Sequence, residues 1–288
     1  MTERPRMLCV HAHPDDEAIV TGGVLARYAD EGVVTAVVTC TGGELGEIHN
    51  MDADAVRPRL AEVRRAELQR SLAILGAGEP RLLGYRDSGM MGTEGNDDPA
   101  AFWRASFDEA VGRLVAHIRA LRPDVLVTYD PFGGYGHPDH IQAHRVALVA
   151  SEACAMAALY PDAGPAWTVS KVYWAAWPKS FIRELSAELR RRGRPSPFAE
   201  DGRVGELSMG TPDDEVTTTV DVGRWLERKW AALRAHRSQL AAESFFLNLP
   251  EELRAAGLGT EWFVRHRSRV AAPTREDDLL AGLRSARD

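Results

Sequence analysis

Two clusters of histidine and aspartate residues have the composition and spacing of metal ligands. The first runs from His11 to Glu17 with the sequence HAHPDDE, and the second is His137–His140 with the sequence HPDH. Zinc favours imidazole and carboxylate ligands, and a catalytic zinc site has three protein ligands and one position open to water. His13 and Asp16, together with one histidine of the second cluster, would supply such a set.

The chemistry expected of such a set is the hydrolysis of an amide. Asp15 stands beside a ligand and is free to take a proton from the water, as in a metal-assisted hydrolase near neutral pH. The remaining histidine of the second cluster would polarise the carbonyl oxygen or protonate the leaving amine. One cluster alone is also explained by a solvated turn, but two clusters after two strands favour a metal site.

Each cluster follows an apolar run that we expect to be a buried strand. These runs cover residues 7–11 and 125–129, and a third, over 33–40, leads into a polar run from Thr39 to Glu47. Runs of β-branched residues without polar alternation are typical of strands buried on both faces. Because ligands of an open parallel sheet lie beyond the carboxyl ends of its strands, we expect the three polar runs to converge.

The remaining elements predict the fold class. Helical periodicity and glycine end signals indicate helices over residues 18–31, 60–75, 110–121 and 138–158, with a short strand over 81–83. Later strands are expected over 169–176 and 216–221, and later helices over 181–192 and 222–236. This order predicts an α/β fold with a Rossmann-like, mostly parallel sheet and helices on both faces. We expect a single domain over 1–288, with a core of about 5–180 and a C-terminal elaboration of about 181–288.

The composition argues against several classes of protein. The 288 residues carry 35 Lys and Arg against 42 Asp and Glu, a net charge of -7, which argues against a nucleic-acid partner. The apolar stretch over 146–160 is too short to span a bilayer, and the first residues lack an apolar signal core. The three cysteines are far apart and are expected to be buried and reduced. We expect a soluble, cytoplasmic protein without a membrane partner, and a homo-oligomer is left open.

The pairing of HPDDE, from His13 to Glu17, with HPDH at His137–His140 resembles the LmbE/PIG-L family of zinc N-deacetylases. Within that family the chain is similar to the actinobacterial branch of mycothiol metabolism. The branch contains an N-acetylglucosaminyl-inositol deacetylase and a mycothiol S-conjugate amidase. The resemblance covers about residues 5–180 and implies a small N-acyl amino sugar as substrate and Zn²⁺ as cofactor. Fe²⁺ fits the same ligands.

The resemblance also implies the roles of individual residues in the two clusters. His13, Asp16 and His140 would be the zinc ligands, and Asp15 would be the general base. His137 falls where the family has a histidine that stabilises the tetrahedral intermediate or acts as an acid.

The resemblance also implies roles for residues outside the proposed ligand set. Asp139, between the two histidines of the second cluster, would orient one of their rings. Tyr135 matches a tyrosine that donates to the oxyanion. Arg64 and Asp87 match positions that contact the sugar, and Glu47 matches a position near the inositol. The segment from Ala235 to Gln239 is similar to one near the cleft in the family.

Two members of the branch remain as alternatives. Residues 25–32, 41–44, 160–164 and 167–171 resemble the S-conjugate amidase, but the amidase has a lysine where this chain has Val20 or Thr21. The stretches from Arg86 to Met90 and from Tyr135 to His137 are closer to the deacetylase. The deacetylase is therefore preferred, with the amidase, or a related enzyme of antibiotic biosynthesis, as the alternative.

Other classes of protein fit the sequence less well. A phosphoacceptor receiver domain also places paired acids after its first strand, but it has no use for His137–His140. A dinucleotide-binding domain requires the G-x-G-x-x-G spacing, which the glycines over 42–46 lack. A catalytically dead sugar-binding module would be expected to have lost Asp15.

Overall fold

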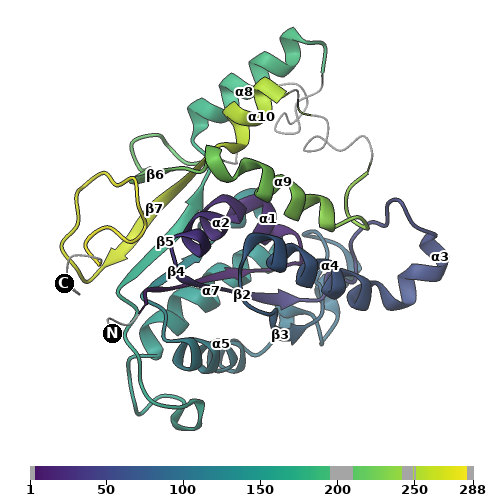
Figure 1. Ribbon diagram of the computed structural model, residues 1–288. Helices are drawn as coiled ribbons and strands as arrows, with labels where there is room; N and C mark the ends of the chain where they lie inside the picture. Colours follow the sequence, from purple (N-terminus) through teal and green to yellow (C-terminus); the bar gives the residue numbers. More distant parts are fainter. Residues whose placement is uncertain (1–3, 195–209, 242–248, 250, 284–288) are drawn as a thin grey trace.

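A computed structural model of the chain describes residues 4–194, 210–241, 249 and 251–283. One seven-stranded sheet has the order β3-β2-β1-β4-β5-β7-β6 (Figure 1). Its strands are β1 (Arg6–His11), β2 (Val34–Thr41), β3 (Arg81–Tyr85), β4 (Val125–Thr128), β5 (Lys171–Ala176), β6 (Thr218–Asp221) and β7 (Thr260–Ser268). The strands from β3 through β5 in this order are parallel, β7 runs antiparallel to β5, and β6 antiparallel to β7.

Helices cover both faces of the sheet. They are α1 (Asp16–Val20), α2 (Gly22–Asp30), α3 (Ala53–Val56), α4 (Leu60–Leu75), α5 (Phe107–Leu121), α6 (Gly133–Gly136), α7 (Pro138–Ala153), α8 (Lys179–Arg191), α9 (Leu226–Ala235) and α10 (Glu251–Leu258). In Figure 1, α2, α4 and α9 lie on one side, and α5 and α7 on the other. Side chains of β1 alternate accordingly: Met7 and Cys9 belong to one core cluster, and Leu8 and Val10 to the other. The predicted fold class is confirmed.

The strand order creates a crevice beside the first strand. β1 lies between β2 and β4. The chain runs from β1 to β2 and β3 on one side and then crosses back to β4 on the other side. At such a switch point the loops at the carboxyl ends of the two strands separate, and ligands of doubly wound sheets bind there. The loop after β1 carries the first histidine and aspartate cluster, and the loop after β4 leads to the second.

Some element boundaries differ from those predicted. The helix expected over 18–31 is two helices, because Thr21 interrupts it with a non-helical φ of -133° and ψ of 10°. The next turn needs glycine, since a Cβ on Gly23 would lie 2.4 Å from a methyl of Val222. The helix expected over 138–158 ends at Ala153. Neither α10 nor β7 was expected, and β7 is partly exposed and rich in charge, which obscures its strand pattern.

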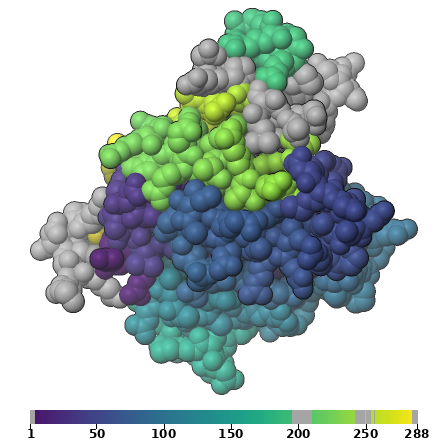
Figure 2. Space-filling model, turned by 45° about the vertical axis from the view of Figure 1, so that its right-hand side comes forward, coloured from purple at the N-terminus to yellow at the C-terminus, as the bar shows by residue number. Residues whose placement is uncertain are grey.

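The C-terminal part of the chain packs on the core. α9 lies across α2 and α4 (Figure 2). The Lys229 ammonium lies 2.7 Å from Glu261, whose carboxylate also accepts from the backbone of Gly23 and Val24. Among the residues described, no helix combines the length and apolar character needed to cross a membrane. The three cysteines are buried free thiols, as expected.

Candidate active site

The loops that follow β1, β2, β3 and β4 enclose a cavity of about 660 Å³. It is lined by His13, Asp15, Asp16, Ile19, Val20, Leu45, Gly46, Glu47, Arg64, Asp87, Gly89, Met90, Tyr129, Asp130, Gly133, Gly134, Tyr135, His137, His140, Ala175, Trp177, Gly210 and Gln239. A cavity of this size suits a ligand of sugar or disaccharide dimensions. Of the site residues predicted from the sequence, Asp139 alone is absent from this lining, and it lies directly behind His13.

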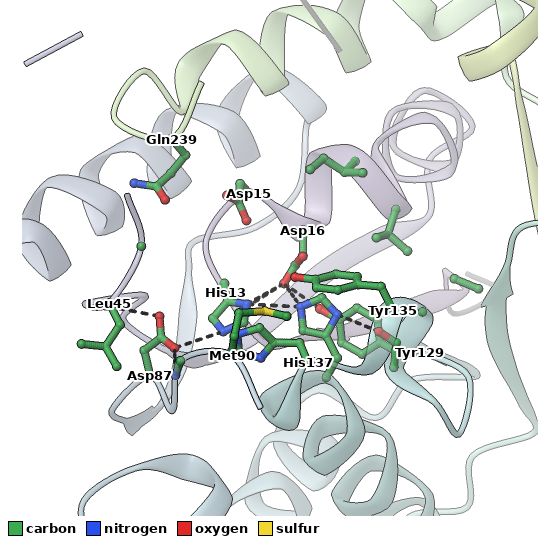
Figure 3. A pocket seen from close by; sticks show the side chains of 18 of the residues that line it. His13, Asp15, Asp16, Leu45, Asp87, Met90, Tyr129, Tyr135, His137 and Gln239 are labelled. Atoms are coloured by element: carbon green, nitrogen blue, oxygen red, sulfur yellow. Dashed lines mark hydrogen bonds and ion pairs between the residues drawn. The ribbon is translucent and has the colours of Figure 1, made fainter. Parts of the chain in front are cut away.

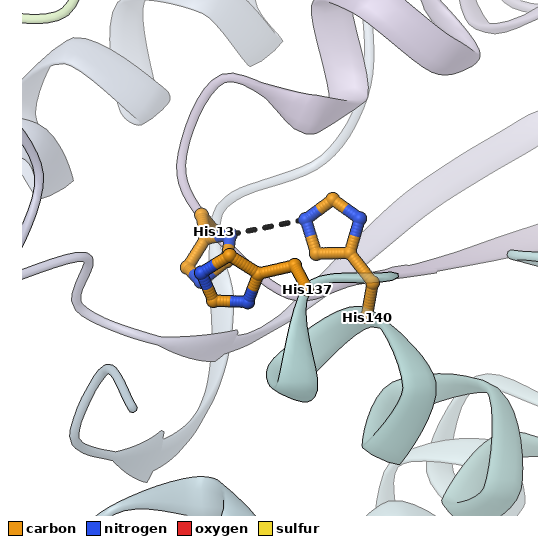
Figure 4. Close-up of side chains that lie close together, drawn as sticks. All are labelled: His13, His137 and His140. Atoms are coloured by element: carbon orange, nitrogen blue, oxygen red, sulfur yellow. Dashed lines mark hydrogen bonds between the residues drawn. The ribbon is translucent and has the colours of Figure 1, made fainter. Parts of the chain in front are cut away.

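Three donor atoms of the two clusters meet at one point of this cavity. His13 Nδ1 lies 3.2 Å from His140 Nε2 (Figure 4), and Asp16 Oδ2 lies 3.5 Å from each of these nitrogens. Tetrahedral ligands at zinc bond lengths would be separated by about 3.3–3.6 Å. The spacing of the three atoms therefore fits one zinc ion.

The outer nitrogens of the two rings have partners of their own. His140 Nδ1 lies 3.1 Å from the carbonyl oxygen of Gly133, and His13 Nε2 lies 3.2 Å from Asp139 Oδ2. An imidazole that donates from its outer nitrogen presents a lone pair on the inner one. Burial lowers the pKa of His140 to about 3, which favours its neutral form. Burial alone would lower the pKa of His13, but its hydrogen bonds to Asp139 and Asp16 raise it well above its usual range. A metal bound between the two rings would therefore displace a proton from His13 and meet two lone pairs and a carboxylate oxygen.

Asp16 is held at this point by two donors. Its Oδ2 accepts from the Tyr129 hydroxyl at 2.7 Å and from the His13 backbone at 2.8 Å. Burial alone would raise the pKa of Asp16, but His140 and His13 hold it well below its usual range. No role for Tyr129 was predicted, although its place at the end of the strand predicted over 125–129 puts it beside the first cluster.

Gly133 allows His140 to approach the loop after β4. Its φ is 68°, a left-handed conformation that disfavours residues with a side chain, and a Cβ there would lie 2.6 Å from His140 Cβ. Its carbonyl oxygen is the partner of the His140 ring. Glycine is therefore required at this position.

Asp15 lies beside His13 and Asp16 (Figure 3) and has an unusual backbone conformation. Its φ is 123°, and its side chain is 21% exposed. Burial raises the pKa of Asp15 to about 6, and the Arg64 guanidinium, 3.1 Å from Oδ2, opposes this rise. A carboxylate with such a pKa can take up and release a proton near neutral pH.

His137 and Tyr135 complete the wall on the side of the second cluster. His137 caps α7, and its Nδ1 accepts from the Asp139 backbone at 3.1 Å, so the neutral ring carries its proton on Nε2. Burial and His13 lower the pKa of His137 to about 4. A ring nitrogen of His137 lies within 4.8 Å of nitrogens of His13 and His140. Tyr135 is 48% exposed, with its ring centroid 5.0 Å from that of His140.

The Asp139 carboxylate contacts a different ring from the one expected. The sequence suggested a histidine of its own cluster, but the Asp139 carboxylate accepts from Ser88 and contacts His13 Nε2 at 3.2 Å. The reason is that α7 turns this side chain inward, toward the loop after β3. Asp139 therefore links the second cluster to the first.

The three residues predicted to contact substrate line the cavity, with different surroundings. Arg64 is buried and donates to the carbonyl oxygens of Gly43 and Pro14 as well as to Asp15. Asp87 is buried, accepts from the Gly89 and Leu45 backbones, and lies 3.7 Å from His13 Nε2. The Glu47 side chain is 86% exposed.

The segment His236–Gln239, which follows α9, reaches the cavity from the C-terminal part of the chain. Gln239 lies above the loops that carry Leu45 and Asp87 (Figure 3), and its Nε2 donates to the carbonyl oxygen of Glu47. Ser238 O accepts from the His49 backbone at 2.7 Å. This segment therefore forms part of the cavity wall.

The sequence matches the PIG-L family, described as GlcNAc-PI de-N-acetylase, over residues 8–151. A 1D-myo-inositol 2-acetamido-2-deoxy-alpha-D-glucopyranoside deacetylase from Geodermatophilus obscurus is 46% identical, over 98% of this chain and 99% of the relative. A Catenulispora acidiphila protein of the same name, numbered 1, is 45% identical over 98% of this chain and 90% of the relative.

Two solved structures are similar in fold. N,N'-diacetylchitobiose deacetylase from Pyrococcus horikoshii has a TM-score of 0.63 at 21% identity and covers 92% of this chain and 84% of its own. The 4-carboxy-2-hydroxymuconate hydratase from Pseudomonas putida has a TM-score of 0.58 at 20% identity and covers 93% of this chain and 99% of its own. These two enzymes are named for different reactions, so a shared fold alone does not identify the reaction.

Proposed function

Because this chain belongs to the PIG-L family of de-N-acetylases, we propose that it hydrolyses the acetamide of N-acetylglucosaminyl-inositol to acetate and a free amine. The observation that carries this proposal is the meeting of three metal-donor atoms within 3.5 Å of one another beside a carboxylate. The names of the relatives favour this substrate over a mycothiol S-conjugate. The reaction would belong to mycothiol biosynthesis.

His13, Asp16 and His140 would hold the metal, which we propose to be zinc. Two imidazoles and one carboxylate are a ligand set of catalytic zinc sites, and iron(II) fits the same set. When bound, zinc would polarise the acetamide carbonyl and lower the pKa of water at its open position.

Asp15 would act as the general base. Arg64 holds Oδ2 of its carboxylate, which leaves Oδ1 to take the proton of the attacking water. The water oxygen bonds to the acetamide carbon as this proton passes to Asp15. Fixing the carboxylate in this way removes the entropy cost of orienting it during the reaction.

His137 and Tyr135 would serve the later stage. A neutral His137 carries its proton on Nε2 and can donate a hydrogen bond to the developing oxyanion, as can the Tyr135 hydroxyl. When the carbon–nitrogen bond breaks, the leaving nitrogen takes a proton from Asp15 or His137. Acetate and the protonated amine are then released.

Metal removal tests the proposed function. Protein treated with a chelator should release no amine from N-acetylglucosaminyl-inositol, and one equivalent of Zn²⁺ should restore turnover. Amine and acetate are both measured, because deacetylation yields them in equal amounts. Turnover that persists in metal-free protein would contradict the proposal.

Asp139→Asn is expected to weaken metal binding rather than to abolish it. The amide oxygen cannot support the His13 ring as the carboxylate does, and loss of such an outer partner weakens metal affinity by about 10- to 100-fold. Competition with a chromogenic chelator measures the change. Unaltered affinity would show that Asp139 does not act through His13.

Asp87→Asn is expected to lower kcat/KM for the sugar substrate by about 10- to 100-fold, as expected when a hydrogen bond to a charged group is lost. The effect should fall on KM, because Asp87 would bind the sugar and not the reacting atoms. Steady-state kinetics on N-acetylglucosaminyl-inositol measures both constants. A change confined to kcat would argue against a sugar contact.

A further inference from the structure

Two buried carboxylates anchor the segment His236–Gln239 to the core. Glu17 Oε1 lies 2.7 Å from His236 Nε2. The two oxygens of Glu67 accept from the backbone and the hydroxyl of Ser238, at 2.9 and 2.6 Å. Glu17, Glu67, His236 and Ser238 are all fully buried. The two anchors are therefore closely matched in burial and chemistry.

Glu17 differs from Glu67 in what its second oxygen contacts. Glu17 Oε2 accepts from the backbone nitrogen of Asp15 at 3.0 Å. Glu67 uses both oxygens on Ser238 and, in the described part of the chain, makes no hydrogen bond to Asp15. A single carboxylate thus joins the C-terminal segment to the backbone of the proposed general base.

Asp15 needs such support because its backbone conformation is unfavourable. A φ of 123° with a ψ of -30° lies outside the regions that residues with a side chain ordinarily occupy. Strained conformations persist only where the surrounding structure holds them. Arg64 holds the carbonyl oxygen of Pro14 on one side of the peptide, and Glu17 holds the Asp15 nitrogen on the other.

Glu17 is itself fixed by its contacts. Its Oε1 accepts from the Ser71 hydroxyl at 2.5 Å as well as meeting His236. A buried carboxylate is retained only where its oxygens are hydrogen-bonded, and these partners fix its rotation. The ring of His236 enters from the end of α9, 219 residues later in the sequence.

We propose that Glu17 is a positioning residue that holds the backbone of Asp15, and that His236 acts through Glu17. The C-terminal elaboration then completes the catalytic centre of the N-terminal core instead of only covering it. The inference rests on the proposed function, because it takes Asp15 as the general base.

The matched variants Glu17→Gln and Glu67→Gln test the proposal. Each replaces one buried carboxylate by its isosteric amide, and the melting temperature of each variant measures its loss of stability. Glu17→Gln should lower kcat by about 10-fold or more with little change in KM, since small misplacement of a reacting group is costly. Glu67→Gln should lower the melting temperature but leave kcat within about 3-fold of wild type. Metal content is measured in both and should be unchanged.

His236 provides a second pair of variants that leaves Glu17 in place. Glutamine at this position can donate to Glu17 Oε1, whereas leucine cannot. The kcat of His236→Gln should therefore exceed that of His236→Leu, with equal KM and equal metal content. A purely structural role would lower the melting temperature of both variants without this order in kcat.

The outcomes separate this inference from the proposed function. If the wild-type protein turns over but Glu17→Gln and Glu67→Gln lose kcat equally, the role proposed for Glu17 is wrong while the proposed function stands. The same holds if missing metal explains the loss of kcat in Glu17→Gln. If Glu17→Gln does not fold, the order of the His236 variants decides the question by itself. Wild-type protein that releases no amine from any N-acyl amino sugar overturns the proposed function and this inference with it.

Discussion

Asp15→Asn is expected to lower kcat for deacetylation by about 10²- to 10⁴-fold, the contribution typical of a positioned general base. Asparagine has the shape of aspartate but cannot take the proton of the attacking water. KM should change little, because the acetamide and the sugar keep their contacts. Single-turnover release of acetate, measured on zinc-loaded protein, reports the chemical step directly.

Asp130→Asn is the matched control for this variant. Asp130 lines the same cavity, but its Oδ1 accepts from the backbones of Phe132 and Gly134, which an asparagine oxygen can also do. The control should keep kcat within about 5-fold of wild type. Equal losses in the two variants would mean that Asp15 is not the base.

Asp16→Ala is expected to remove the metal together with the activity. The carboxylate oxygen is one of three donors, and two imidazoles alone hold zinc weakly. Zinc content after dialysis should fall from about one equivalent to near zero, while the fold, measured by circular dichroism, persists. Full zinc occupancy in this variant would refute the assignment of Asp16 as a ligand.

Tyr129→Phe gives a graded comparison with Asp16→Ala. It removes the 2.7 Å hydrogen bond to Asp16 Oδ2 and leaves the ligand itself. Metal affinity should fall by about 10- to 100-fold, less than for loss of the ligand. A weaker affinity than that of Asp16→Ala would mean that Tyr129 does more than hold the carboxylate.

The sheet and the convergence of the two clusters could be predicted because local sequence patterns indicate both. Apolar runs marked β1, β2 and β4, and parallel strands place their carboxyl ends at one edge of the sheet. The sequence order of polar runs was therefore enough to place His13, Asp16 and His140 together. The family and the class of reaction followed from the same motifs.

Contacts between distant segments could not be predicted. The role of Glu17 depends on His236, and that of Asp139 on His13, and no local pattern encodes these partners. The left-handed conformation of Asp15 is likewise set by surrounding contacts, since aspartate has no intrinsic preference for a φ of 123°. The contact of Glu17 with His236 and the choice of ring that Asp139 contacts were accordingly missed.

We propose that residues 1–288 form one folded unit, because β6 and β7 continue the sheet that begins in the core. The C-terminal elaboration also contributes Gln239 and, through Glu17, His236 to the site. A cytoplasmic location and the absence of a nucleic-acid partner stay predictions from the sequence, which leaves a homo-oligomer open.

Amine release from N-acetylglucosaminyl-inositol and from a mycothiol S-conjugate, compared on the same zinc-loaded protein, decides which amide this site hydrolyses. Asp15→Asn serves as the blank for hydrolysis that does not depend on the site. We predict that the acetylated sugar is cleaved with the higher kcat/KM. Preference for the S-conjugate would make the chain an amidase, and cleavage of neither substrate by metal-loaded protein would contradict the account.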